Sequence, residues 1–311
     1  MKNHYLFLLI LLSFQVFAQV DSLKTEKLSR LKVAGTVIKN GILSVPSDFT
    51  EMGHTVTADW KRTVLYAGGI VGLIATDKIT TGFLHDQIEP TIDYTLPKID
   101  VIKTKIDWID GNNAYILYPI LGLYAGSFAL NNQKGQRVAV NAIKAISYSY
   151  VISHLLLKTI SGRNRPQRPL NGDESAIAPW TKDNWDFGNY HPLYFQSKTD
   201  GTSFPSFHAT FYFSVAKVFQ MEYNNYWIPY TIATGVFLAD IKSHNHWVSD
   251  LLVGGLVGTI IGKSVVNSSR KQAAKINRPA VIENPKKFKM NKQLVPQITS
   301  SMVGFHFVGS F

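Results

Sequence analysis

The chain has 311 residues, enough to bury a substantial core in one large domain or two small ones. Hydrophobic residues make up 45% of it and the mean hydropathy is +0.00, which indicates a globular protein and is low for an integral bundle of several spanning helices. The formal net charge of +11 favours anionic partners such as phosphates or lipid headgroups, and the absence of cysteine excludes disulfides, thiol nucleophiles and thiolate metal ligands.

The first 18 residues have the composition of a secretory signal. Lys2 supplies the positive end, residues 5–17 supply the apolar centre, and Ala18 is a small residue before the expected cleavage point. The apolar stretch is short for a stable membrane span. The pattern predicts a signal peptide over residues 1–18 and a mature protein in the periplasm or another extracytoplasmic space, with association with a membrane surface left open.

Helical spacing of apolar residues dominates residues 19–273, which we expect to form one all-α helical domain. Apolar clusters recur at this spacing in residues 64–75, 115–130, 138–157, 209–219, 227–239 and 251–266. Glycines in the first and last clusters lie in pairs or at four-residue intervals. They are predicted to let helices approach closely, and they are Gly68, Gly69, Gly72, Gly254, Gly255, Gly258 and Gly262.

The sequence allows two interpretations of how these helices relate to a membrane. A membrane span needs about 20 apolar residues, and only the uncharged stretch of residues 115–130 approaches that length. Charged residues interrupt or bound the other apolar clusters. The pattern favours a soluble or peripheral helical bundle, and an integral bundle is the alternative.

Two regions depart from the helical pattern. Residues 167–202 lack periodicity and are rich in aromatic residues, which predicts either a lid over a site or aromatic side chains packed against the bundle. Residues 274–311 form a basic linker that leads to an alternation of Val303, Phe305, Phe307 and Phe311, which predicts a strand-like tail.

Two short clusters carry residues suited to binding phosphate. KTISGRNRP contains Lys158 and Arg165, whose side chains can bind phosphate oxygens as a point charge and as a planar fork. SFPSFHAT contains Ser206 at an expected helix N-cap, so that amides of the first turn, including that of Phe207, point toward an anion. His208 in the same turn can protonate a leaving oxygen.

The third cluster, HNHWVSD at residues 244–250, allows three interpretations, of which the simplest is a polar helix start without chemistry. His246 and Asp250 are four residues apart, so in a helical turn the carboxylate can hold one ring nitrogen and leave the other free to attack. Alternatively, His244 and His246 with a following acid indicate a metal site. That site would need further ligands from other elements, for which the chain offers His154, His191 and His208.

In order and spacing, the three clusters resemble the motifs of the type 2 phosphatidic acid phosphatase superfamily, K-x6-RP, PSGH and SR-x5-H-x3-D. Lys158 with Arg165 and Pro166 matches the first, residues 205–208 match the second except at its glycine, and His246 with Asp250 matches the core of the third. The resemblance covers residues 158–262 and implies a helical bundle. It also implies phosphatase chemistry through a phosphohistidine, without a metal or other cofactor.

The resemblance implies a role for each matched residue. His246 would be the nucleophile, Asp250 would orient it and His208 would be the acid, while the phosphate would be bound by Lys158, Arg165, Ser206 and the amide of Phe207. The implied enzyme is an acid phosphatase or phosphatidate phosphatase-like hydrolase whose substrate is a phosphate ester, a lipid phosphate or a pyrophosphate. The vanadium haloperoxidases share this site but depend on bound vanadate. Nucleic acid is not an expected partner, because only the net charge favours it.

Two positions depart from the motifs. Phe207 replaces the glycine; its amide can still bind phosphate if its φ is negative, and its ring is expected to narrow the pocket. Asp240 stands where the family has an arginine, and the loss of that contact costs about 2–4 kcal/mol. Lys242 or Arg163 is the expected source of the missing charge. Asp240 also supports the alternative of a non-catalytic member that binds phosphate or phospholipid.

Overall fold

The structure is a computed structural model that describes residues 29–97, 99, 109, 111–170, 179–196, 198–243, 245–276, 291–298 and 303–310. The chain divides into two compact units, Met1–Ala273 and Ala274–Phe311. The predicted signal peptide and most of the predicted basic linker lie outside the described residues, so both stay predictions.

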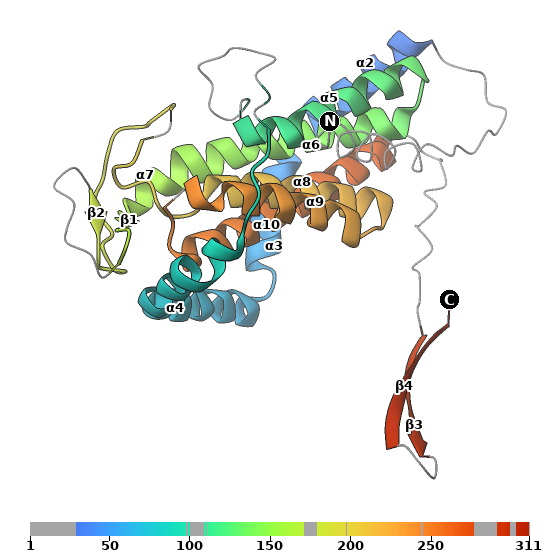
Figure 1. The fold of residues 1–311 in the computed structure, drawn as a ribbon. Helices are drawn as coiled ribbons and strands as arrows, with labels where there is room; N and C mark the ends of the chain where they lie inside the picture. Colours follow the sequence, from blue (N-terminus) through green and yellow to red (C-terminus); the bar gives the residue numbers. More distant parts are fainter. Residues whose placement is uncertain are drawn as a thin grey trace. The chain divides into compact units, whose positions relative to one another are not determined.

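Helices build the first unit (Figure 1). The α-helices are α2 (Arg30–Leu43), α3 (Val45–Thr57), α4 (Trp60–Phe83), α5 (Ala114–Ala129), α6 (Gln133–Ser149), α7 (Lys158–Ser161), α8 (Phe207–Tyr223), α9 (Trp227–Asp240) and α10 (Val248–Ile276). Shorter π and 3-10 segments are η2 (Leu84–Ile88), η3 (Glu89–Thr91), η4 (Gly111–Asn113), η5 (Tyr150–Leu157) and η6 (Ile241–Ser243). The expected all-α fold is confirmed.

The second unit contains a β-hairpin. Strands β3 (Asn291–Ile298) and β4 (Val303–Ser310) pair antiparallel, with Ile298 opposite Val303. The sequence predicted the second strand but assigned residues 291–298 to a linker. Pro296 has no backbone N–H to donate, so the local sequence of residues 291–298 does not predict a strand. The segment forms a strand because it pairs with β4.

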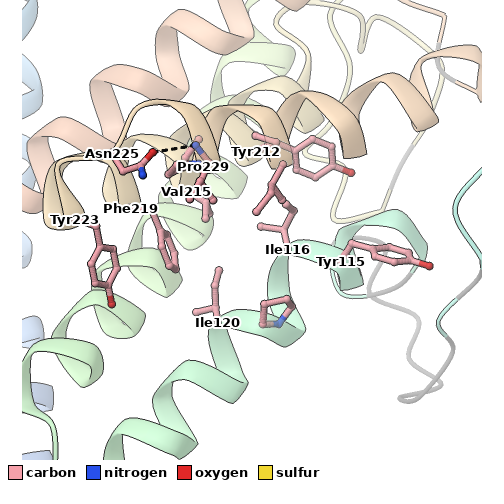
Figure 2. A pocket seen from close by; sticks show the side chains of 14 residues that line it. Tyr115, Ile116, Ile120, Tyr212, Val215, Phe219, Tyr223, Asn225 and Pro229 are labelled. Carbon is pink, nitrogen blue, oxygen red and sulfur yellow. Dashed lines mark hydrogen bonds between the residues drawn. The ribbon is translucent and has the colours of Figure 1, made fainter. Parts of the chain in front are cut away.

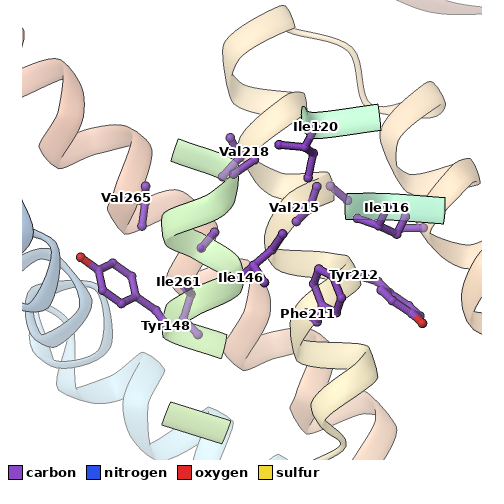
Figure 3. Packing of buried hydrophobic residues seen from close by; sticks show 14 of the residues in the cluster. Ile116, Ile120, Ile146, Tyr148, Phe211, Tyr212, Val215, Val218, Ile261 and Val265 are labelled. Atoms are coloured by element: carbon purple, nitrogen blue, oxygen red, sulfur yellow. The ribbon is translucent and has the colours of Figure 1, made fainter. Parts of the chain in front are cut away.

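The core of the first unit surrounds α6. Val138, Ala142 and Ala145 on this helix are fully buried, at the spacing of one helical face. Apolar side chains from α5, α8 and α10 belong to the same cluster (Figure 3), among them Ile116, Ile120, Phe211, Val215, Val218, Ile261 and Val265. The helices that carry the second and third motifs therefore share one core.

Glycines on α10 allow its backbone to approach that of α8. A Cβ added at Gly254 would lie 2.5 Å from the carbonyl oxygen of Ser206. One added at Gly258 would lie 2.9 Å from the amide nitrogen of Ser214 and still closer to the carbonyl oxygen of Thr210. The predicted close approach is confirmed for this pair of helices.

Helix α4 behaves differently. A Cβ added at Gly68, Gly69 or Gly72 would meet no atom within 4 Å in the described part of the chain, so the predicted close approach is wrong there. Its large apolar side chains are exposed, with Leu65 71% and Ile79 77% accessible. The residues that α4 buries lie on one stripe in its second half, and they are Ile74, Asp77 and Thr81.

Among the described residues, one helix, Val248–Lys275, is long and apolar enough to cross a membrane. Half of its apolar window is buried inside the fold, and a core helix of a soluble protein meets the same criterion. The stretch predicted to come closest to a span, residues 115–130, forms α5, which has 16 residues. Length and composition alone therefore do not establish a membrane span.

The loop before α8 is tied to the bundle at several points. Short strands β1 (Arg165–Pro166) and β2 (Trp180–Thr181) pair in parallel, and the hydroxyl of Tyr150 donates a 2.6 Å hydrogen bond to the carbonyl oxygen of Phe195. Trp185 and Tyr190 are exposed, at 48% and 76%. The prediction that the aromatic side chains pack against the bundle is therefore wrong for these two residues. The alternative prediction, a lid over a site, stays a prediction.

Candidate active site

The three sequence clusters meet at the ends of three helical segments. Lys158 begins α7 with Arg165 just beyond it, Ser206 precedes α8, and His246 and Asp250 lie at the start of α10. The amide of Ser206 donates a 3.0 Å hydrogen bond to the carbonyl oxygen of Asp250, which joins the second cluster to the third. Arg165 donates a 3.4 Å hydrogen bond to the carbonyl oxygen of Asn245 and joins the first cluster to the same place.

A small cavity lies between the second and third clusters. Its volume is about 10 Å³, the space of about one water molecule. Its lining consists of Ser206, His208, Phe237, Asp240, Ile241, His246 and Leu251. A larger apolar cavity of about 70 Å³ is lined by α5, α8 and α9 (Figure 2), but no motif residue lines it. Of the predicted site residues, Ser206, His208 and His246 line the small cavity, whereas Lys158, Arg165, Phe207 and Asp250 do not.

His246 and Asp250 pair as their spacing predicts. His246 is 3% exposed, and its Nδ1 lies 3.4 Å from Oδ2 of Asp250. This contact is long, as catalytic hydrogen bonds often are before substrate binds. Nδ1 is the ring nitrogen that faces the carboxylate, and His246 lines the small cavity.

The carboxylate of Asp250 is fully buried and is held on both oxygens. Oδ2 accepts hydrogen bonds from the hydroxyl of Ser203 at 2.5 Å and from the amide of Trp247 at 3.0 Å, and Oδ1 accepts one from Arg163 at 2.6 Å. Burial raises the pKa of Asp250, whereas the charge of Arg163 and these hydrogen bonds lower it. The carboxylate is therefore fixed in the orientation that faces His246.

Lys158 and Arg165 are buried cations placed near one another. Burial and then the charge of Arg165 lower the pKa of Lys158 to about 7, and Asp250 opposes this shift. Burial likewise lowers the pKa of Arg165 to about 10. The Nη atoms of Arg165 make 3.4 Å hydrogen bonds to Asn245 and Thr202, and its buried Nε has no partner among the described residues. An anion bound here would relieve the cost of burying two like charges.

The start of α8 presents backbone donors as expected. Ser206 is its N-cap, and Oγ accepts a 3.4 Å hydrogen bond from the amide of Ala209. Phe207 is the first helical residue and does not have a positive φ, so its amide is one of the donors left without a helical partner.

The ring of Phe207 points into the protein core. It packs against the rings of Tyr150, His154 and Phe211 at centroid distances of 6.1, 5.7 and 5.9 Å, and it does not line the cavity. The expectation that this ring narrows the pocket is wrong, because the aromatic residues of η5 and α8 offer it an apolar site.

Asp240, which replaces the family's arginine, faces the expected acid. Its Oδ2 lies 4.0 Å from Nε2 of His208, and its Oδ1 accepts a 2.9 Å hydrogen bond from Asn112. Both side chains line the small cavity, where the charge of Asp240 opposes a phosphate.

The two cations expected to compensate for Asp240 are engaged elsewhere. Lys242 donates a hydrogen bond to the carbonyl oxygen of Ile92, and Arg163 lies between the carboxylates of Asp77 and Asp250. Neither lines the cavity. The prediction that one of them supplies the missing charge is wrong, because two buried carboxylates hold Arg163. His244 lies outside the described residues.

The sequence reasoning missed three groups around this site. Ser203 bonds Asp250, while Ser249 and Asp77 surround Arg163. Asp77 had one usable signal, because it is the carboxylate that ends the uncharged stretch of residues 63–76. A carboxylate at the end of an apolar helix stretch is costly to bury unless it has a partner.

The metal interpretation of HNHWVSD finds no ligand set in the described part of the chain, where no group of three or more His, Asp or Glu side chains could hold a metal ion. Two of the proposed ligands make other contacts. The ring of His154 stacks on Tyr150 at 5.0 Å, and that of His191 stacks on Tyr194 at 4.4 Å. His244, which the metal interpretation also requires, lies outside the described residues, so this interpretation stays an alternative.

Known proteins share part of this chain. Residues 139–273 match the sequence model of a family described as the PAP2 superfamily. The chain is also similar to the lipid A 1-phosphatase of Porphyromonas gingivalis, with 32% identity over 84 residues that cover 25% of this chain and 18% of that protein. The match thus spans less than a fifth of the relative's length. No solved structure matches the chain.

Proposed function

Because residues 139–273 place the chain in the PAP2 superfamily, we propose that the protein is a phosphatase that hydrolyses lipid phosphates or related phosphate esters at the cavity beside His246. The observation that carries the proposal is the pair of buried cations, Lys158 and Arg165, close to the His246–Asp250 pair and the start of α8. Within the described ranges neither cation forms an ion pair, although the charge of Asp250 acts on both, and two such buried cations are suited to a phosphate group.

The reaction needs two steps and no metal ion. In the first, Nε2 of His246 forms a bond to phosphorus as the bond to the leaving oxygen breaks, and His208 gives that oxygen a proton. In the second, water attacks the phosphohistidine, transfers a proton to His208 and releases inorganic phosphate. Asp250 holds Nδ1 throughout, while Lys158, Arg165, Ser206 and the amide of Phe207 bind the phosphate oxygens.

Substrate entry requires the cavity to open. The present volume of about 10 Å³ holds about one water molecule, which is smaller than a phosphate group. Asp240 and His208 face each other in this cavity, so movement of these side chains is the simplest way to admit the substrate. The negative charge of Asp240 would then stabilise the protonated acid, at the cost of repelling the phosphate.

Exposed apolar surface supports a lipid substrate and association with a membrane. Residues 63–76 of α4 carry no charge, and Leu65 and Val71 within them are exposed. Trp60 and the cations Lys61 and Arg62 precede this stretch, as expected where a helix meets a lipid surface. Together with the predicted signal peptide, these features support a reaction at an extracytoplasmic membrane surface.

The alternative is a member of the same fold that binds phosphate or phospholipid without hydrolysing it. Asp240 is the specific observation in its favour, because a carboxylate lines the cavity where the family has an arginine. Such a protein would keep the cation pair and the helix start but would lack turnover.

The proposal can be tested with the full chain purified from membranes. Phosphate release is measured in EDTA on phosphatidate, a lipid pyrophosphate and a small aryl phosphate, for the wild type, His246→Ala and His54→Ala. His54 is an exposed histidine of α3 and serves as the matched control. We expect turnover that persists in EDTA, vanishes in His246→Ala and persists in His54→Ala, together with an acid-labile phosphoenzyme.

Other outcomes separate the components of the proposal. Loss of turnover in EDTA would contradict the metal-independent step. Binding of inorganic phosphate without turnover on any substrate would establish the non-catalytic alternative. Release of the protein from membranes by high salt or alkali alone would contradict membrane association through apolar surface.

A further inference from the structure

We propose that Asp77 of α4 is a positioning residue for the His246–Asp250 pair and acts on it through Arg163. The inference rests on the function proposed above. Asp77 lies outside the segment that matches the family, residues 139–273, and no sequence motif singled it out. Its side chain does not line the cavity, so it does not touch the substrate.

The Nη atoms of Arg163 are held by two carboxylates, and two aromatic rings lie against its guanidinium. Its guanidinium is fully buried, and Nη1 donates to Oδ1 of Asp250 at 2.6 Å while Nη2 donates to Oδ2 of Asp77 at 2.8 Å. The rings of Phe187 and Trp247 lie 4.8 and 5.1 Å from its Cζ atom. These partners fix the orientation of the planar guanidinium, and Arg163 therefore links the carboxylate of Asp77 to that of Asp250.

Asp77 also holds the backbone that carries Asp250. Its Oδ1 accepts a 2.9 Å hydrogen bond from the amide of Ser249, and its Oδ2 accepts a hydrogen bond from the hydroxyl of the same residue. Ser249 precedes Asp250 in the first turn of α10, where amide groups lack helical partners. Asp77 therefore fixes Asp250 by two routes, one through Arg163 and one through the first turn of α10.

The charges explain why this arrangement favours catalysis. Arg163 carries one positive charge and contacts two carboxylates, so the group keeps a net negative charge. The positive charge of Arg163 is shared between the carboxylates of Asp77 and Asp250. Arg163 therefore neutralises less of the negative charge of Asp250, which attracts the imidazole of His246 more strongly. A neutral residue at position 77 would leave Asp250 as the one carboxylate that Arg163 contacts in the described part of the chain, which would weaken the hold of Asp250 on the imidazole.

The chain provides a matched control in Asp48 of α3. Like Asp77, Asp48 is fully buried, and it also precedes the family segment. It pairs with Lys144 at 2.6 Å, accepts a 2.6 Å hydrogen bond from Tyr148 and accepts another from Ser268. Both aspartates have a cation and a serine as partners, but Asp48 has none of its partners in the proposed site.

The experiment compares Asp77→Asn with Asp48→Asn in the full chain, with kcat and KM corrected for the folded fraction. We expect kcat to fall about 10- to 100-fold in Asp77→Asn, the scale seen when an outer partner of a site residue is lost, with KM changed by less than about threefold. Asp77→Glu should recover part of kcat. Asp48→Asn should lose stability and keep kcat. If Asp77→Asn does not fold, Ser249→Ala tests the same link and should lower kcat in the same direction.

A second readout does not depend on turnover. The ring nitrogen resonances of 15N-labelled histidine, with His246 assigned from His246→Gln, should shift in Asp77→Asn and stay in place in Asp48→Asn. Equal losses of kcat in the two variants, or an unshifted His246 resonance in Asp77→Asn, would overturn the inference. A wild type that is inactive on every substrate would overturn the proposed function, and the resonances of His246 would still decide the role of Asp77.

Discussion

Helices α10 and α4 both carry glycines within apolar stretches, but these glycines have opposite surroundings. On α10, Gly254 and Gly258 are four residues apart, so they lie on one stripe, and the backbone of α8 lies against it. On α4, Gly68, Gly69 and Gly72 have no described atom within 4 Å of an added Cβ.

The difference shows that small residues permit close packing but do not cause it. On α10, the glycine stripe continues into a shared hydrophobic core, because Ile261 and Val265 of the same helix are buried there. On α4, the glycines lie in the exposed half of the helix, and the buried stripe that includes Asp77 begins only after them. Close packing at α10 also sets the spacing between Ser206 and Asp250, so there it has a consequence for the site.

Among the glycines of α4 and α10, the largest expected effect of an added methyl group is at Gly258. Gly258→Ala places Cβ against the backbone of Thr210 and Ser214, and neither backbone atom can move aside as a flexible side chain would. We expect the free energy of unfolding to fall by about 3 kcal/mol, the upper end for overpacking. Denaturant unfolding of the full chain measures it, and an unchanged midpoint would contradict the packing of α10 against α8.

A smaller loss of stability with a larger effect on the site is expected at Gly254. In Gly254→Ala the added methyl group lies 2.5 Å from the carbonyl oxygen of Ser206 and 2.9 Å from Cβ of Ala209. Relief of this clash moves the start of α8, and we expect about 2 kcal/mol of destabilisation. The affinity for inorganic phosphate should also fall. Titration calorimetry with inorganic phosphate compares the affinity of Gly254→Ala with that of Gly258→Ala. Equal affinities in the two variants would contradict a specific effect of Gly254 on the site.

The smallest effect, of opposite sign, is expected at Gly69. An added methyl group has open space there, and alanine is favoured over glycine inside a helix by about 0.5–1 kcal/mol. Gly69→Ala should therefore raise the free energy of unfolding by up to that amount and leave kcat unchanged. A marked loss of stability would show that α4 packs closely against a partner, such as a second chain.

Much of the fold follows from local sequence. Ser206 as an N-cap, the helix that follows it and the His246–Asp250 pair all depend on residues at most four positions apart, and the structure contains all three. The glycine pattern shows the limit of such reasoning, because the same residue type predicts packing correctly on α10 and wrongly on α4.

The candidate site was predicted in part. The motifs predict that Lys158, Arg165, Ser206 and His246 converge, and of these four residues Ser206 and His246 line the small cavity. The direction of the Phe207 ring and the partner of Lys242 were not predictable from spacing. Each depends on which group of another segment offers a better contact. Lys242, for example, can bind either an anion or a carbonyl oxygen, and the groups that surround it in the fold decide which one it contacts.

The sequence by itself determined the helical class, the order of the three motifs and the pairing of residues within one helical turn, because these relations follow from the periodicity of the α-helix. Only the tertiary structure decided that Arg163 joins Asp77 to Asp250, which lie 86 and 87 residues from it in the chain. Such contacts have no local signal. They exist because a buried charge must find its partner wherever the packing of the helices brings one.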